Sequence, residues 1–338
     1  MDWRKGYSAS YYLMLVDPST LGDIERYEIV GGTIKHESTN LRTSADLDCV
    51  NYTYTNERLI RVWMDTKQTG EPSGHEPLFT GYTSSPDRKI EGTKETAKLE
   101  CYSVLLPAYD MLLERGWYAP VESDALVLIK QLLRVCKVPV NISTKEDKNR
   151  SLTQSIVAEN GETHLTMVEK LLSAMNWRMS IDGYGRIYIQ PYDSEPIQTF
   201  DSRIYDVLET DLTVSYNWFD CPNVVRVNLD DDYAVAKDQD SDTPMSIQNR
   251  GREVWYEEDD VALNDGETLQ EYAYRRLNEL QRVSTTISYQ RRFHPNVRVA
   301  DTIMLNYPRQ GIVGNFLVTS QAIELGFNAQ TSEEVIRL

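Results

Sequence analysis

The sequence has few of the residues on which metal, thiol or imidazole chemistry depends. Its 338 residues include only four cysteines and four histidines, and no two cysteines form a CxxC pair. No apolar run approaches the roughly eighteen residues that a membrane-spanning helix needs. The N-terminal segment, Met-Asp-Trp-Arg-Lys-Gly-Tyr, lacks the apolar core of a signal peptide. We therefore expect no membrane span and no export, and free buried thiols rather than disulfides or a metal site.

Motifs of known catalytic and nucleotide-binding sites are missing as well. The chain contains no GxxxxGK[ST], GxSxG, HExxH or GxGxxG motif. Its histidines, His36, His75, His164 and His294, are far apart in the sequence and are expected to be packing or surface residues. No pair of the many carboxylates stands out as a glycosidase dyad. We therefore expect no enzyme activity, no catalytic residue and no bound cofactor.

Acidic residues are concentrated in one segment, which contains Asp230, Asp231, Asp232, Asp238, Asp240 and Asp242. The segment lacks the spacing and the central glycine of an EF-hand calcium loop. We expect residues 230–242 to form a mobile, solvated loop without a metal, and a cation bound there is the open alternative. Asp301 lies at the start of a predicted strand, where a hydrogen bond that closes a turn is favoured over a catalytic role.

The charge balance is strongly negative. The formal net charge is −17, from 52 acidic and 35 basic residues. Because affinity for nucleic acid depends on cations that neutralise phosphates, this composition argues against a general nucleic-acid binder. Two explanations of the excess are left: solubility, or an acidic surface past which DNA slides without sticking. The 21 tyrosines, against six phenylalanines, suit strand faces that are half wet or buried between subunits.

Residues 1–105 have the pattern of a β-rich module. Apolar and polar residues alternate in short segments that glycine and proline interrupt, which is typical of half-buried antiparallel strands. The expected strands lie within residues 11–16, 29–47, 59–64, 78–82 and 98–104. Their number and spacing predict a meander or barrel.

Residues 106–198 have a different character, which predicts a small α+β module. Apolar residues share one helical face from Leu126 to Cys136, with Ser123 or Asp124 placed to cap that helix and Pro139 beyond its end. A second helix is expected over residues 165–175. Asp182-Gly183, flanked by alternating apolar residues, then predicts a tight hairpin.

Residues 199–338 return to a β pattern with one helix. Strands are expected at residues 212–216 and 224–229, and a helix over residues 266–282, where Asn264 and Glu267 have the spacing of a capping box. The last strands are expected at residues 285–289, 297–305 and 316–325. The predicted fold class is therefore mainly β with an α+β insertion, with one antiparallel β-barrel within 1–105 and a second, of similar fold, within 199–338.

The order of these modules resembles the tail hub proteins of phages and phage tail-like particles, the late control protein D-like family. The resemblance rests on the strand Asn223–Asn228, on the helix opened by Gly-Glu-Thr, and on two segments, His294–Leu305 and Gly314–Val318. In the family a glycine commonly precedes the aspartate of the His294–Leu305 segment, and this chain has Ala300 there. The resemblance covers most of the chain as a pattern, and no single motif in it is specific.

The resemblance implies two tube-like barrels per subunit and a homotrimer that presents a six-fold ring to a hexameric tail tube. The implied partners are the tail tube or distal tail protein on one side and a central spike or tail fibre on the other. DNA would pass without being bound specifically. The implied location is the virion tail, after assembly in the cytoplasm of the host bacterium.

Two other functions are open at this stage. One is the N-terminal platform of a tail-associated cell-wall hydrolase, although a chain ending at Leu338 is expected to leave no room for a catalytic domain. The other is a soluble carbohydrate-binding β protein, which the tyrosines and tryptophans suggest.

Overall fold

The computed structural model describes residues 2–3, 5–84, 86–91, 94–138, 142–144, 151–191, 195–201, 212–219, 221–259, 261, 263, 266–282, 285–327 and 329–338. As the sequence predicts, the described chain is mainly β, with large antiparallel sheets. None of its described helices has both the length and the apolar character to cross a membrane.

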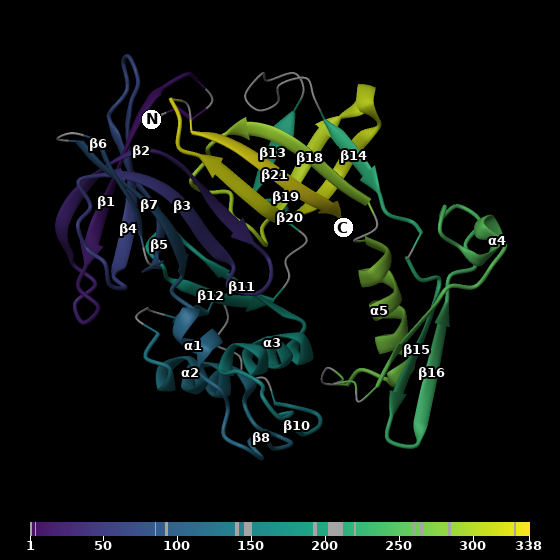
Figure 1. Cartoon of the computed structure of the whole chain (residues 1–338). Helices are drawn as coiled ribbons and strands as arrows, with labels where there is room; N and C mark the ends of the chain where they lie inside the picture. The colour runs from purple at the N-terminus through teal and green to yellow at the C-terminus, as the bar shows by residue number, and fades with distance from the viewer. Residues whose placement is uncertain are drawn as a thin grey trace.

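The N-terminal strands form a set of antiparallel pairings that closes on itself (Figure 1). They are β1 (Ser8–Val16), β2 (Asp23–Glu37), β3 (Thr43–Val50), β4 (Leu59–Lys67), β5 (Gly74–Thr83), β6 (Asp87–Glu91) and β7 (Lys94–Ser103). The order is β1-β4-β5-β7-β3-β2, and β1 also pairs with β2. Alternation decides which side chains are inside. In β3, for example, Ala45, Leu47 and Cys49 are buried, whereas Asp48 is exposed.

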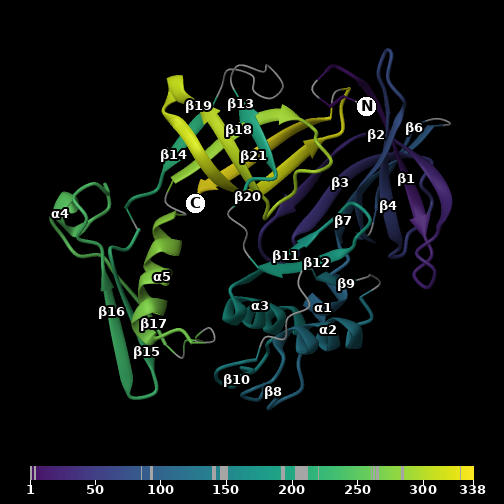
Figure 2. The same cartoon turned by 180° about the vertical axis from the view of Figure 1, so that it is seen from behind.

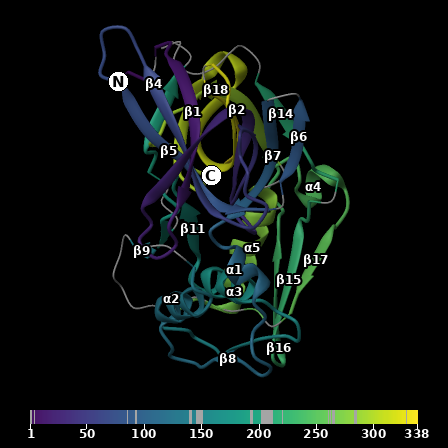
Figure 3. The same ribbon diagram turned by 60° about the vertical axis from the view of Figure 1, so that its left-hand side comes forward.

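The helical region below these strands contains the two helices that the apolar periodicity predicts (Figure 3). Its elements are α1 (Leu106–Asp110), β8 (Tyr118–Ala119), α2 (Ala125–Val135), β9 (Ile142–Thr144), β10 (Ile156–Val157), α3 (His164–Met175), β11 (Trp177–Ile181) and β12 (Ile187–Pro191). Asp124, rather than Ser123, caps α2, because its carboxylate accepts a hydrogen bond from the Val127 N–H at 3.1 Å. Pro139 lies outside the described residues.

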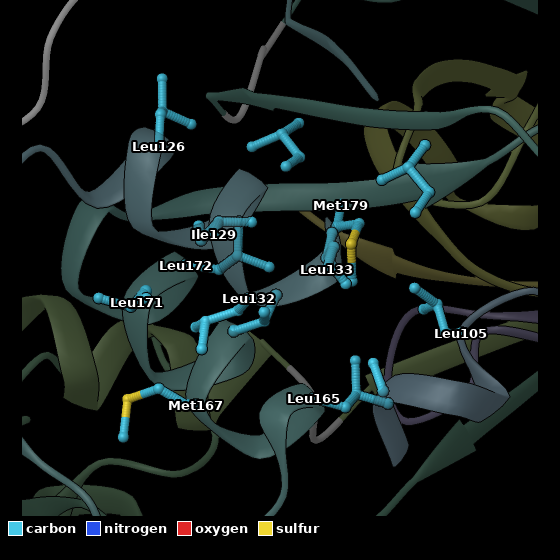
Figure 4. Packing of buried hydrophobic residues seen from close by; sticks show 14 of the residues in the cluster. Leu105, Leu126, Ile129, Leu132, Leu133, Leu165, Met167, Leu171, Leu172 and Met179 are labelled. Carbon is cyan, nitrogen blue, oxygen red and sulfur yellow. The ribbon is translucent and has the colours of Figure 1, made fainter. Parts of the chain in front are cut away.

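The core of this region consists of the two apolar helix faces and the sheet beside them. Figure 4 shows the leucines of α2 and α3 packed together next to Met179 of β11: Leu126, Leu132 and Leu133 from one helix, and Leu165, Leu171 and Leu172 from the other. Burying each such side chain stabilises the fold by about 1.5–3 kcal/mol. The hairpin β11–β12 is present, but residues 182–186 connect it, so the turn is longer than Asp182-Gly183 predicts. The Asp182 carboxylate closes it by accepting a hydrogen bond from the Arg186 N–H at 2.9 Å.

The C-terminal region contains a second group of strands and a separate arm (Figures 1 and 2). Its elements are β13 (Gln198–Asp201), β14 (Thr213–Tyr216), β15 (Val224–Leu229), β16 (Asp232–Lys237), α4 (Ile247–Arg250), β17 (Trp255–Glu258), α5 (Leu269–Arg282), β18 (Thr285–Arg292), β19 (Thr302–Tyr307), η1 (Pro308–Gln310), β20 (Ile312–Glu324) and β21 (Gln330–Arg337). The strand order is β14-β18-β21-β20-β19-β13. In the arm, α5 packs on the sheet of β15, β16 and β17 and buries Tyr272, Ala273 and Leu277 against it.

The prediction of a loop throughout residues 230–242 is wrong. Residues 232–237 form β16, which pairs with β15 from Leu229 opposite Asp232 onward. Asp230 makes the tight turn possible with a left-handed φ of 51°. Ala234 and Ala236 are buried under α5, so alternation of small apolar residues outweighs the acidic composition.

Two element boundaries also differ from the predictions. The capping box of α5 lies one turn later than expected: the Thr268 hydroxyl accepts from the Glu271 N–H at 3.3 Å, and Glu271 accepts from the Thr268 N–H at 2.9 Å. Asn264 lies outside the described residues. The strand expected over 297–305 begins only at Thr302, because the chain turns at Ala300 with a φ of 70°.

The two groups of strands are joined edge to edge. Residues 33–37 of β2 pair with residues 320–324 of β20 in antiparallel register, from Thr33 opposite Glu324 to Glu37 opposite Ser320. The pairing merges both groups into one 13-stranded sheet. Their relative position is therefore set by backbone hydrogen bonds as well as by side chains.

Candidate assembly surfaces

The structure does not bring the histidines together. His75 lies flat on Trp63, with ring centroids 4.1 Å apart, and its Nδ1 is 2.6 Å from Asp65 Oδ1. His164 opens α3, and its Nδ1 lies 2.9 Å from the Met111 carbonyl oxygen. His36 sits on β2 where β2 meets β20. Each of these rings has a packing or hydrogen-bonding role on a different element.

The acidic segment is organised by its own hydrogen bonds. The Asp238 carboxylate accepts from the Asp240 N–H at 3.0 Å, from the Thr243 hydroxyl at 2.7 Å and from the Gln281 amide at 3.0 Å. Within the described ranges, no three His, Cys, Asp or Glu side chains converge as metal ligands would. The role of Asp238 is to hold this segment against the end of α5.

Asp301 has the turn-closing role that its position predicts. Its Oδ2 accepts a hydrogen bond from the Arg298 N–H at 3.0 Å, within the turn that holds Ala300. Its other carboxylate oxygen lies 3.8 Å from Arg178 Nη2 of β11. Asp301 therefore joins this turn to the helical region.

One face of the joined sheet is continuous across both groups of strands. Its path runs β6-β7-β3-β2-β20-β21-β18-β14, and every neighbouring pair is antiparallel. On one side the residues are buried in the two cores, and on the other they are exposed or half-buried. We call this second side the acidic face. Charged residues on it, on the strands from β7 to β18, include Asp46, Asp48, Glu100, Glu28, Glu37, Glu324, Glu334, Lys35, Lys98 and Arg292.

Beneath the acidic face, a buried ion pair joins β18 to β21 in the second group of strands. Arg291 donates two hydrogen bonds to Glu333, at 2.7 and 3.0 Å, and Gln321 donates a third at 2.6 Å. The Tyr289 hydroxyl also donates to this carboxylate. Burial alone would raise the pKa of Glu333, but the Arg291 guanidinium and the hydrogen bonds outweigh it and lower that pKa. Removing one partner of this pair would be strongly destabilising, because it would leave the other charge buried without compensation.

Two arginines tie the helical region to the first group of strands. Arg42 donates to both carboxylate oxygens of Glu169, at 2.6 and 2.7 Å, and to the Met179 carbonyl at 3.0 Å. Arg61 binds Asp23 at 2.6 Å and contacts Thr80, whose hydroxyl donates to the Gly183 carbonyl at 2.7 Å.

The hairpin at Gly183 packs directly on β5. A Cβ on Gly183 would lie only 1.9 Å from the Pro77 carbonyl oxygen, so the approach requires glycine.

Large apolar side chains are exposed near both ends of the continuous sheet. Ile90 on β6 has 67% of its surface exposed, and Tyr216 on β14 has 60%. Trp218 and Phe219 follow β14, and Phe219 is 76% exposed. Figures 1 and 2 place β6 and β14 at opposite ends of the strand-rich part of the molecule. Exposed apolar residues of this size mark surfaces that associate with other molecules.

Comparison with solved structures relates the fold to phage tail proteins. A tail protein from Neisseria meningitidis is 15% identical, with a TM-score of 0.73, and the match covers 98% of this chain and 97% of that one. The 43 kDa tail protein of prophage MuSo2 from Shewanella oneidensis is 13% identical, with a TM-score of 0.69 and coverage of 98% and 97%.

A third solved structure connects the fold to secretion systems. It is an E. coli component of the type VI secretion system, described as similar in structure to the T4 bacteriophage tail proteins gp27 and gp5. It is 10% identical, with a TM-score of 0.54, and the match covers 92% of this chain and 74% of that one. No protein-family model matches the sequence, and no curated protein does. The chain therefore has the fold of phage tail proteins.

Proposed function

We propose that this chain is a structural hub of a phage tail tip or baseplate. Three copies, each contributing two tube-like barrels within residues 1–105 and 199–338, form a ring that joins a hexameric tail tube to a central spike or fibre. The observation that carries the proposal is the continuous antiparallel sheet, which spans both groups of strands and has strand edges at its two ends. The likeness to tail proteins over nearly the whole chain supports it.

The acidic face supports a second part of the proposal, that this side of the sheet lines a channel for DNA. Carboxylates outnumber cations on it, and Asp46, Glu100 and Glu324 lie close to one another in register. Duplex DNA carries one negative charge per roughly 1.7 Å of its axis, so aligned cations would hold it in place. An acidic wall repels the duplex over about 8 Å at physiological salt. DNA then passes without specific binding.

The helical region and the arm are surfaces for other parts of the tail in this proposal. The arm residues stand beside the joined sheet and carry exposed aromatic rings, among them Tyr233 and Trp255. Cations lie over both rings, Arg226 at 4.9 Å and Lys237 at 5.5 Å. The proposed role is structural and non-enzymatic, and the fold that the chain shares with phage tail proteins supports it.

The mass of the purified chain in solution tests the proposal. The expected result is an assembly of three chains of 38.9 kDa each, measured by light scattering after size-exclusion chromatography. A monomer that binds oligosaccharides would instead support the carbohydrate-binding alternative. Lysis of cell walls in a zymogram would support the hydrolase platform. Either of these results contradicts the hub.

A further inference from the structure

The sheet of the arm has one covered side and one open side. Helix α5 covers the side on which Val225, Val227 and Ala236 are buried. Because side chains alternate along a strand, the intervening positions are on the opposite side. That side faces away from the two groups of strands and from the helical region (Figures 1 and 2). We call it the open face, and its side chains include Arg226, Asn228, Tyr233, Lys237, Trp255 and Glu257.

Two aromatic rings on the open face have most of their surface in solvent. Tyr233 of β16 is 64% exposed and Trp255 of β17 is 53% exposed. A cation lies over each ring, Arg226 over Tyr233 and Lys237 over Trp255, and restrains its orientation. Such rings offer an apolar surface beside a polar tip, and exposed groups of this size mark places where other molecules bind.

The spacing of the two rings matches an extended ligand. Tyr233 lies opposite Asn228 of β15, and Trp255 lies opposite Val224 of the same strand. The rings are therefore four positions apart along β15, which is about 13 Å, and on strands about 10 Å apart across the sheet. Several sugar rings in a row span such a distance, whereas a single one does not.

Polar side chains between the rings are fixed by hydrogen bonds. The Asn228 amide donates to Glu257 at 2.9 Å and to Asp259 at 2.7 Å, and its oxygen accepts from Arg226 at 3.1 Å. Beside the other ring, Lys237 and the Trp255 indole both donate to Glu253, at 2.7 and 3.0 Å. Polar groups that are already held in place lose little conformational freedom when a ligand binds.

The charges of the open face favour an uncharged ligand. Arg226 lies 3.4 Å from Glu257, and Lys237 lies 2.7 Å from Glu253, so each cation has a carboxylate partner. Nucleic acid binds through cations that neutralise its phosphates, and here the carboxylates compete for them. A protein partner would have to bury these ion pairs, and taking paired charges out of water is costly.

We propose that the open face binds an extended, uncharged oligosaccharide of β-1,4-linked hexoses. The flat C–H face of each such sugar stacks on an aromatic ring, and its hydroxyl groups donate to carboxylates and accept from the amide and the guanidinium. OB-folds likewise bind oligosaccharides on a face of their sheet. The inference goes beyond the proposed hub and does not depend on a ring, since all the residues belong to one arm. It gives this one face an occupant other than a tail protein.

Titration calorimetry of the full chain tests the proposal. The probes are the tetramers of β-1,4-linked N-acetylglucosamine and of β-1,4-linked glucose, together with their dimers. We expect a tetramer to bind more tightly than its dimer, because only the longer sugar reaches both rings. Binding of either tetramer supports the inference, and the preference between them shows whether the acetamido group is recognised. Binding of neither, or binding of the polyanion heparin alone, overturns it.

Substitutions of the exposed rings locate the site. Tyr233→Ala and Trp255→Ala should each weaken binding of the tetramer about tenfold, since each removes one stacking contact. Tyr233→Phe keeps the ring and should bind like the unmodified chain. Tyr274→Ala is the matched control, because Tyr274 is 50% exposed in the same arm but lies on α5. Equal affinity in all four variants overturns the inference, and circular dichroism checks that each variant is folded.

The mass of the same samples separates this inference from the hub. A trimer that binds neither tetramer refutes the oligosaccharide site and leaves the hub standing. A monomer whose affinity for a tetramer depends on Tyr233 and Trp255 refutes the hub and leaves the site.

Discussion

Asp46 lies directly opposite Glu100 across the antiparallel pair of β3 and β7, and both carboxylates are on the acidic face. Thr33 of β2 is the next residue in this row, and Glu324 of β20 lies opposite Thr33. Like charges directly opposite each other destabilise a sheet. The proposed channel explains why the chain retains them: they repel DNA rather than stabilise the fold.

Neutralising this pair should increase both stability and DNA retention. For Asp46→Asn combined with Glu100→Gln, we expect the free energy of unfolding to rise by about 0.2–1 kcal/mol, since a repulsion is removed. Affinity of the assembly for duplex DNA should rise as well, most clearly at low salt. Urea denaturation and fluorescence anisotropy measure the two effects. Glu114→Gln, an exposed change outside this face, is the control, and equal DNA affinity in all three proteins would contradict the channel.

Replacing Ala300 by glycine should stabilise the folded chain. Its φ of 70° is left-handed, which costs roughly 1–2 kcal/mol for a residue with a Cβ. Glycine removes that strain but loses a buried methyl group and has more conformational freedom in the unfolded chain, so we expect Ala300→Gly to stabilise the chain by about 0.5 kcal/mol. Ala45→Gly, at an equally buried position within β3, should destabilise it. Thermal unfolding measures both variants, and a loss of stability for Ala300→Gly would count against the strain.

Gly183 tests the contact between the helical region and β5. Gly183→Ala places a Cβ against the Pro77 carbonyl oxygen, so the hairpin must move and the Thr80 hydrogen bond weakens. We expect a destabilisation of about 1–3 kcal/mol by urea denaturation, the range for overpacking. Gly6→Ala, where nothing lies within 4 Å of the added Cβ, should have little effect. If the two variants are equally stable, the close packing is not needed.

His36 gives the chain a pH-dependent stability. Burial disfavours its charged form and lowers its pKa to about 4, from 6.5 when exposed. The unfolded state therefore binds more protons between these two values, so stability falls as pH drops from 6.5 towards 4. Denaturation midpoints at several pH values measure the slope. His36→Gln should flatten it in this window, and an unchanged slope in the variant would show that His36 is not responsible.

Local structure could be predicted from the sequence where one periodicity dominates. The apolar face from Leu126 to Cys136 and the capping carboxylate of Asp124 define α2 without help from the rest of the molecule. The predicted boundaries of strands were wrong where the alternating pattern continued past a turn. Val297 and Val299 alternate like strand residues and are buried, yet they precede the turn at Ala300.

Long-range pairing carried no signal in a single sequence. The junction between β2 and β20 joins residues almost three hundred positions apart, and no pattern in either segment indicates which strand it pairs with. No sequence pattern marks β6, the short segment from Asp87 to Glu91, as an edge strand, because its edge depends on where β5 and β7 lie. The expectation of no catalytic, cofactor or metal residue stays a prediction.

Electron cryomicroscopy of the purified assembly tests the central claim most directly. The account predicts a ring of three copies around an open channel, with Asp46, Glu100 and Glu324 on the channel wall. An assembly without a channel, or a ring whose acidic face points outward, would contradict it.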